Sequence, residues 1–326
     1  MTKTERTMTS NFKFSLADVS TYRSELMGWS ILWIMMLHFR FLQIAPIGFI
    51  AQYGFAGVEI FMFVSGLGLY YSLDKDDHLL PFYRKRLLRI FPTYYILGIF
   101  FSIFIYHDTI LTYLFRFTTI GYWTNGIYAE WYIPAIVFLY LLAPFFKQLF
   151  TSQRLVYAAL LAFAILIASV LLVERDDLID TRFYFLLYRI PAFLLGMACA
   201  YWIKNNASTK YYYLIALLGI PAFIWLFPQH HVVYRYKYLS LLFLMPCFIM
   251  VFCTISKLIP LLNRGISQMG NASLEIYLIQ GIIFCAIING ELVVPTLWHD
   301  LFTLLFIAVS TLLGIGAHWL FQRLRL

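Results

Sequence analysis

Charged residues are scarce in this chain. Only 12% of its 326 residues are Asp, Glu, Lys or Arg, whereas 62% are hydrophobic. A soluble globular domain carries about 25% charged residues, so this composition excludes the soluble globular class. The mean hydropathy of +0.78 agrees with a chain that is largely embedded in a membrane.

Cysteine is also scarce, and its distribution argues against two kinds of site. The four cysteines lie singly within hydrophobic stretches, without any CxxC pair, although two of them share one stretch; they are Cys199, Cys247, Cys253 and Cys285. Disulfide frameworks and zinc sites place cysteines at paired spacings. We therefore expect no metal site and no disulfide framework, and we assign the cysteines to apolar packing.

Long hydrophobic runs are what the chain has in abundance. A helix needs about 20 apolar residues to cross the hydrocarbon layer, and hydropathy identifies ten such stretches. They begin near Leu26, Gly54, Thr93, Trp131, Val156, Tyr184, Tyr211, Tyr238, Ile276 and Phe302. Runs such as 157–168 are apolar on all sides, which excludes the alternating strands of a membrane barrel. The sequence predicts an all-α polytopic membrane protein with about ten transmembrane helices.

The basic residues predict how these helices are oriented. Short cytoplasmic loops retain Lys and Arg, and most of the 24 basic residues fall on one side if the N-terminus is cytoplasmic. Both termini are then cytoplasmic, in a multi-pass protein of the cell membrane. This topology explains the net charge of +8 without a nucleic-acid partner. We expect a cytoplasmic tail over 1–22, one transmembrane domain over 23–326, and no cleaved signal peptide.

Two ionisable residues predicted inside the membrane are candidates for catalysis. His38 lies twelve residues beyond Leu26, so it sits roughly 18 Å from the cytoplasmic end of the first span. Glu59 enters the second span from the other side, and we expect it at a similar depth. A carboxylate that orients a histidine makes it a competent general base. The alternative for His38 is a hydrogen bond that only packs two helices together.

Three further residues near the outer ends of predicted spans are candidates for substrate binding. Arg189 lies inside a span, where an ionisable group is usually functional; the alternative is that its side chain reaches out to the lipid headgroups. Glu130 and Trp131 mark the outer start of the fourth span. An aromatic belt at the membrane interface explains the Trp but not the acid.

A dense cationic patch precedes the third span, in the predicted loop 74–92. Arg86 and Arg89 are neighbours on one face if a helix already begins there, and paired guanidinium groups suit phosphate oxygens. Because this loop is predicted to be cytoplasmic, the patch indicates a site for a soluble anionic cofactor. The alternative is attraction to anionic lipids together with fixing of the topology.

These motifs occur in an order that resembles a known family, the acyltransferase 3 family of ten-span membrane O-acyltransferases. The resemblance covers nearly the whole chain. It is carried by the first span closing on His38, GFAGVEIFMFVSG at 54–66, Arg86-x-x-Arg89 before Pro92, Glu130-Trp131-Tyr132-Ile133, the segment from Arg189 to Gly196, and SLEIYLIQ at 273–280.

The resemblance implies a reaction and its participants. The family transfers an acyl group, most often acetyl, from cytoplasmic acyl-CoA to a hydroxyl of a cell-envelope polysaccharide or related glycan. His38 would remove the hydroxyl proton, Glu59 would orient or stabilise the charged imidazole, and Arg189 or another buried donor would stabilise the oxyanion. The phosphates of acyl-CoA would rest on Arg86 and Arg89, and no metal is needed.

Two positions depart from the family pattern. The family usually has a basic residue eleven positions before its histidine, where this chain has Met27; Arg23 lies one helical turn earlier and is our candidate for that role. Gln280 stands where many relatives have histidine, and it can hydrogen-bond but cannot act as a base.

Two other functions also fit the sequence. A transporter or flippase of lipid-linked sugars would have many spans and buried charges, although the paired broken helices typical of transporters are not evident. A noncatalytic membrane protein could use the same charges for packing and for contacts with a partner protein.

Overall fold

The computed structural model describes residues 13–39, 45–75, 78–125, 130–293 and 299–324. Every regular element within these ranges is helical, so the predicted all-α class is confirmed. The elements are α2 (Leu16–Thr21), α3 (Arg23–Phe39), α4 (Ala45–Ala51), α5 (Ala56–Lys75), α6 (Leu79–Phe100), η1 (Phe101–Tyr106), α7 (Ile110–Phe117), α8 (Ile120–Asn125), α9 (Tyr132–Lys147), α10 (Leu155–Leu171), α11 (Thr181–Leu187), α12 (Ile190–Lys204), α13 (Lys210–Leu226), η2 (Phe227–His231), α14 (Arg235–Leu258), α15 (Pro260–Asn271), α16 (Ser273–Ile288) and α17 (His299–Leu324).

Each of the ten predicted spans coincides with a helix, but not all of these helices are long enough to cross a bilayer. Within the described residues, six helices or continuous helix pairs have the required length and hydropathy, and a seventh is formed if α15 and α16, which meet at 73°, are counted as one broken span. The apolar helices α9 and α10 are shorter. The number of about ten spans and the cytoplasmic placement of both termini therefore stay predictions.

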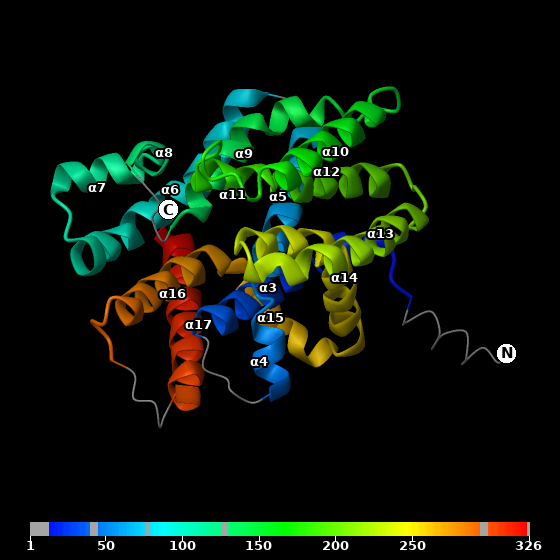
Figure 1. Ribbon diagram of the computed structural model, residues 1–326. Coiled ribbons are helices and arrows are strands. Elements are labelled where there is room, and N and C mark those ends of the chain that lie inside the picture. The colour runs from blue at the N-terminus through cyan, green and yellow to red at the C-terminus, as the bar shows by residue number, and fades with distance from the viewer. Residues whose placement is uncertain (1–12, 40–44, 76–77, 126–129, 294–298, 325–326) are drawn as a thin grey trace.

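Helix α5 lies in the middle of the molecule (Figure 1). Nearly all of its residues from Ala56 to Tyr70 are buried, as expected for a helix that is apolar on all sides. Its closest neighbour is α12. A Cβ added to Gly66 would lie 2.0 Å from the carbonyl oxygen of Phe193, and one added to Gly196 would lie 1.9 Å from that of Phe63. The two backbones are thus in direct contact, which is typical of helix pairs in membranes.

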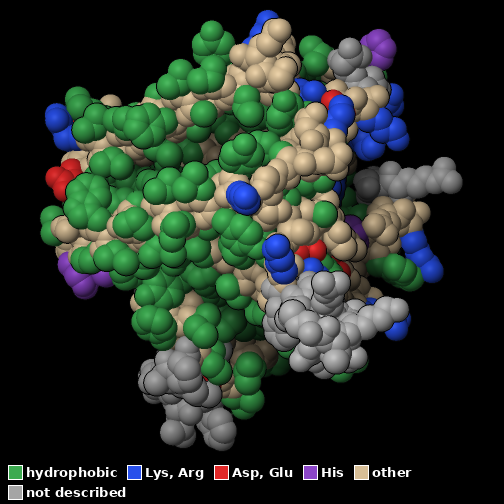
Figure 2. Space-filling view, turned by 90° about the vertical axis from the view of Figure 1, so that its right-hand side faces the viewer, with side chains coloured by type: hydrophobic (Ala, Val, Ile, Leu, Met, Phe, Trp, Pro, Cys, Tyr) green, Lys and Arg blue, Asp and Glu red, His purple; other side chains and the backbone are tan. Residues whose placement is uncertain are grey.

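The outer surface is apolar in the way that a membrane protein requires. Large hydrophobic side chains such as Leu160 on α10, Leu217 on α13 and Leu312 on α17 are more than half exposed. Figure 2 shows hydrophobic side chains across most of one face, with charged side chains and histidine mainly along its two lateral edges. An apolar surface of this extent is unstable in water but is satisfied by lipid chains.

Helix α6 begins earlier than the sequence analysis predicted. The third span was expected from Thr93 onwards, after a loop over 74–92, whereas α6 starts at Leu79 and continues through Pro92. The predicted long loop is wrong, because the cationic stretch is itself helical. Arg86 and Arg89 therefore lie three residues apart on one helix, the arrangement that the sequence analysis considered for this patch.

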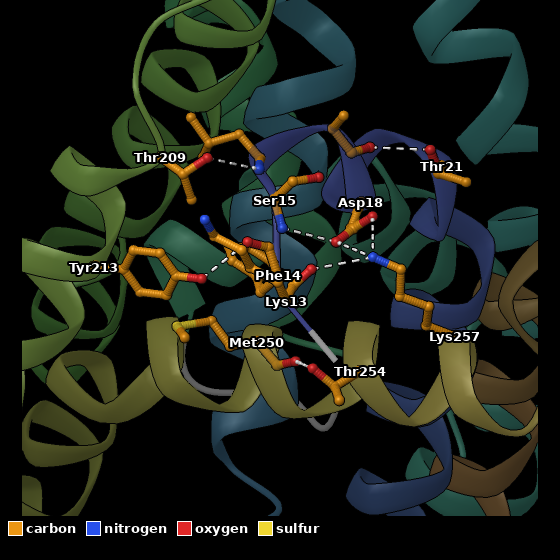
Figure 3. Close-up of polar contacts among 12 residues, drawn as sticks. Lys13, Phe14, Ser15, Asp18, Thr21, Thr209, Tyr213, Met250, Thr254 and Lys257 are labelled. Carbon is orange, nitrogen blue, oxygen red and sulfur yellow. Dashed lines mark hydrogen bonds and ion pairs between the residues drawn. The ribbon is translucent and has the colours of Figure 1, made fainter. Parts of the chain in front are cut away.

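The described part of the N-terminal segment packs against the helices (Figure 3). The side chain of Phe14 is buried, and its carbonyl oxygen accepts a hydrogen bond of 2.9 Å from the hydroxyl of Tyr213. Lys257 on α14 forms an ion pair of 3.2 Å with Asp18 on α2. Residues 13–22, which were predicted to belong to a cytoplasmic tail, are thus attached to α13 and α14.

Candidate active site

A cavity of about 350 Å³ lies among α3, α5, α6, α9, α15, α16 and α17. Part of its wall is polar and part is apolar. The polar side chains include Arg23, Arg86, Arg89, Asn271, Glu275, His318 and Gln322, and the apolar ones include Met27, Ile34, Val58, Phe61, Ile133 and Ile136. A cavity that combines charged and apolar walls suits a ligand with a charged head and a less polar arm.

Three arginines converge on this cavity. Arg23 is the first residue of α3, and Arg86 and Arg89 come from α6. Their like charges repel one another, and in the described part of the chain no carboxylate forms an ion pair with any of them. The Nε atoms of Arg23 and Arg86 are buried without a hydrogen-bond partner. Donors of this kind suit the oxygen atoms of an anion.

Arg23 reaches the cavity because α5 provides space for it. A Cβ added to Gly68 would lie 2.4 Å from a terminal nitrogen of the Arg23 guanidinium. Arg23 and Met27 both line the cavity, so Arg23 reaches the same cavity from one turn before Met27 on α3.

His38 lies at the other end of α3, next to α16. Its Nδ1 is 2.8 Å from Oε1 of Gln280, and its ring stacks on Phe284 with 4.5 Å between the centroids. His38 is not among the residues that line the cavity, but Ile34, one turn before it on the same face of α3, is. The imidazole therefore lies about 6 Å along the helix beyond this part of the cavity wall.

The predicted pairing of His38 with Glu59 is wrong. Glu59 forms an ion pair with Arg189 instead, with 3.2 Å between Oε1 and Nε. The reason is the register between α3 and α5, which run antiparallel to each other: Gly57 of α5 packs against Ser30 of α3. Glu59 is therefore level with the first half of α3, roughly ten residues or about 15 Å along the axis from His38.

Arg189 is enclosed by the protein and does not extend to the headgroups. Only 1% of its surface is exposed. Its guanidinium lies 4.3 Å from the ring centre of Trp131 and 4.4 Å from that of Tyr188, and it donates a hydrogen bond of 2.6 Å to the carbonyl oxygen of Phe185. The snorkelling alternative is thus wrong, and Trp131 serves as one face of an aromatic cage around Arg189.

Glu130 lies in a different environment from Trp131, its neighbour in sequence. Its side chain is buried, and its Oε2 accepts a hydrogen bond of 2.9 Å from the hydroxyl of Tyr106. Glu130, Trp131 and Arg189 do not line the cavity. The structure therefore divides the predicted binding residues into a cavity group (Arg23, Arg86 and Arg89) and a buried group.

The sequence analysis missed a histidine that lines the cavity. His318 on α17 has its Nδ1 3.0 Å from Oε1 of Glu275, and its Nε2 is 2.8 Å from the amide nitrogen of Gln322. A signal was available, since Glu275 lies at the start of one predicted span and His318 lies inside another, where an ionisable residue is usually functional. No group of three or more potential metal ligands exists among the described residues.

Two comparisons relate the chain to known proteins. Residues 26–321 match the model of the acyltransferase 3 family, described as "Acyltransferase domain". The chain is also 25% identical over 199 residues to a protein of Acidianus two-tailed virus named "Putative acetyltransferase ORF330"; the match spans 57% of this chain and 58% of that relative. No solved structure is significantly similar to the chain.

Proposed function

This chain belongs to the acyltransferase 3 family, and from this premise we propose that it transfers an acyl group from cytoplasmic acyl-CoA to a hydroxyl of a cell-envelope polysaccharide or related glycan. The acyl group is acetyl in our proposal, and the protein acts as a multi-pass enzyme of the cell membrane. The observation that carries the proposal is the cavity in which Arg23, Arg86 and Arg89 meet an apolar wall. On α3, the face that lines this cavity with Arg23, Met27 and Ile34 continues to His38.

The donor, acyl-CoA, fits this arrangement along its whole length. The phosphates of acyl-CoA bind to Arg23, Arg86 and Arg89, whose guanidinium groups suit phosphate oxygens. The flexible arm follows the apolar wall past Met27 and Ile34. Arg23 and His38 are fifteen residues apart on α3, or roughly 22 Å, so the thioester lies far from the phosphates.

Gln280 determines which nitrogen of His38 accepts the proton. Its amide nitrogen donates a hydrogen bond of 3.2 Å to the carbonyl oxygen of Tyr277, so its amide oxygen faces His38. Nδ1 of His38 therefore carries the hydrogen and donates it to Gln280. Nε2 is then the unprotonated nitrogen, which is the state that a general base requires.

The reaction follows from this tautomer. Nε2 of His38 takes the proton of the acceptor hydroxyl while the hydroxyl oxygen attacks the carbonyl carbon of the thioester. The carbon–sulfur bond breaks, and the departing thiolate of CoA receives the proton from the imidazolium. Because His38 lies at the end of α3 remote from Arg23, the acceptor enters from the side opposite the CoA phosphates.

The test is acyl transfer by the purified protein in detergent with acetyl-CoA and envelope glycan fractions. We expect free CoA and a glycan ester to form, and we expect His38→Ala to abolish both while CoA still binds. His231→Ala, which removes an exposed histidine outside the cavity, is the matched control. Wild-type turnover by the His38→Ala protein would remove His38 from the mechanism.

The two alternative functions give different results in the same assay. A transporter moves an envelope sugar across reconstituted vesicles without changing it and releases no CoA. A noncatalytic partner protein neither releases CoA nor moves the sugar.

A further inference from the structure

A second polar part of the cavity wall has no role in the reaction described above. Glu275 at the start of α16 and His318 and Gln322 near the end of α17 all line the cavity. They form a chain of contacts in which Nδ1 of His318 is 3.0 Å from Glu275 and Nε2 of His318 is 2.8 Å from Gln322. We call these three residues the mixed wall.

The mixed wall differs chemically from the three arginines. Arginine offers only donors of hydrogen bonds, whereas a carboxylate accepts them and glutamine does both. Glu275 carries a negative charge into a cavity with three cations, and its side chain is only 7% exposed. A carboxylate repels a phosphate, so this part of the wall is unsuited to the anionic groups that the arginines bind.

A neutral group with both donors and acceptors fits the mixed wall. In acyl-CoA, the phosphates that we assign to the arginines are attached to a nucleoside, which carries ring nitrogens, an amino group and a ribose hydroxyl. We propose that Glu275, His318 and Gln322 recognise the nucleoside of the donor. This inference rests on the proposed function, and it makes the nucleotide head, in addition to the acyl arm, a determinant of donor choice.

Each residue of the mixed wall has a distinct role in binding the nucleoside. Glu275 holds His318 through Nδ1 and acts as its positioning residue. His318 is about one quarter exposed (24%) and presents its imidazole to the cavity. Gln322 is exposed at the end of α17, where its amide can turn to satisfy the ligand.

The test compares three ligands by titration calorimetry on the purified protein: CoA, dephospho-CoA and 4′-phosphopantetheine, which lacks the nucleoside. For His318→Ala and Glu275→Gln we expect about tenfold weaker binding of CoA and of dephospho-CoA, the loss of roughly one to two hydrogen bonds. Binding of 4′-phosphopantetheine should not change. Gln322→Ala, a change at an exposed position near the end of α17, should weaken the same two ligands to a smaller extent.

The experiment has one control variant and two outcomes that would contradict the inference. His231→Ala should leave the affinities for all three ligands unchanged. If the His318, Glu275 and Gln322 variants bind CoA as the wild type does, the mixed wall does not recognise the nucleoside, although the donor assignment survives. If the wild-type protein binds neither CoA nor dephospho-CoA, the proposed donor itself is wrong, and this inference is wrong with it.

Discussion

At the scale of single residues, the contact between His38 and Gln280 replaces the carboxylate that the sequence analysis expected. An amide oxygen accepts the Nδ1 hydrogen as a carboxylate does, but it carries no charge to stabilise the imidazolium. Gln280 therefore fixes the tautomer and the orientation of the ring more than it raises the basicity of His38.

A substitution at Gln280 tests this positioning role. We expect Gln280→Leu to lower kcat about tenfold or more with KM nearly unchanged, because the imidazole loses the acceptor that orients it. Gln280→Glu restores an acceptor and should retain most of the activity. Steady-state kinetics with acetyl-CoA measures both, and equal losses in the two variants would contradict the positioning role.

The arginines of α6 permit a matched comparison within the same helix. Arg86→Ala combined with Arg89→Ala should raise KM for acetyl-CoA at least about tenfold and change kcat little, because the lost contacts are with groups remote from the thioester. Arg84→Ala combined with Lys85→Ala removes the same charge from exposed positions outside the cavity. If the two double variants raise KM equally, the effect comes from the overall charge and not from a phosphate site.

The buried ion pair of Glu59 and Arg189 is expected to stabilise the fold. Breaking one partner of a buried pair typically costs about 3–5 kcal/mol, because the other charge stays buried and uncompensated. We therefore expect Glu59→Gln and Arg189→Met each to lower the thermal unfolding temperature in detergent markedly. The double variant Glu59→Leu with Arg189→Met should recover part of the loss, and additive losses would show that the two residues do not act as a pair.

At the scale of helices, the contact between α5 and α12 determines where Glu59 points. The two glycines at the contact allow the backbones to touch, and this places Glu59 beside Arg189. The registers of α5 with α12 and with α3 together explain why a carboxylate that hydropathy placed near His38 lies roughly 15 Å away from it along the helix axis.

Glycine substitutions test this close contact. A methyl group at Gly66 or Gly196 would overlap a backbone carbonyl of the other helix, so Gly66→Ala and Gly196→Ala should each lower the unfolding temperature. The control is Gly316→Ala on α17, where an added Cβ meets nothing within 4 Å. That change should be neutral or stabilising by up to about 1 kcal/mol, since alanine favours a helix. Equal effects at all three positions would contradict the close contact.

At the scale of the whole molecule, the distribution of charge predicts the orientation in the membrane. Lys147 and Lys204 both form ion pairs with Asp74 near the end of α5, at 3.1 and 2.6 Å. The C-terminal ends of α5, α9 and α12 therefore lie together on one side of the molecule. The positive-inside rule predicts that this side is cytoplasmic.

Cysteine labelling in intact cells tests that orientation. In a variant without native cysteines, Lys204→Cys should be protected from an impermeant thiol reagent, and His231→Cys, across helix α13, should react. Both positions should react after the cells are opened. The reverse pattern would place the termini outside and would contradict a donor site that faces the cytoplasm.

The sequence alone was sufficient to predict the fold class, the positions of the helices and the family of this protein. The apolar runs predicted an all-helical membrane protein, and each of the ten predicted stretches coincides with a helix, because burial in lipid depends on composition over a window of residues. Motif order also led to the correct family. These features are local, so they can be recognised without knowing which helices touch.

The tertiary structure decided which polar groups meet. Hydropathy gives the depth of a residue to within a turn or two, but it does not give the face of the helix or the register with a neighbour. For this reason the sequence paired His38 with Glu59, whereas packing pairs His38 with Gln280 and Glu59 with Arg189. The cavity joins Arg23 to Arg86, and Glu275 to His318, only because helices distant in sequence pack side by side.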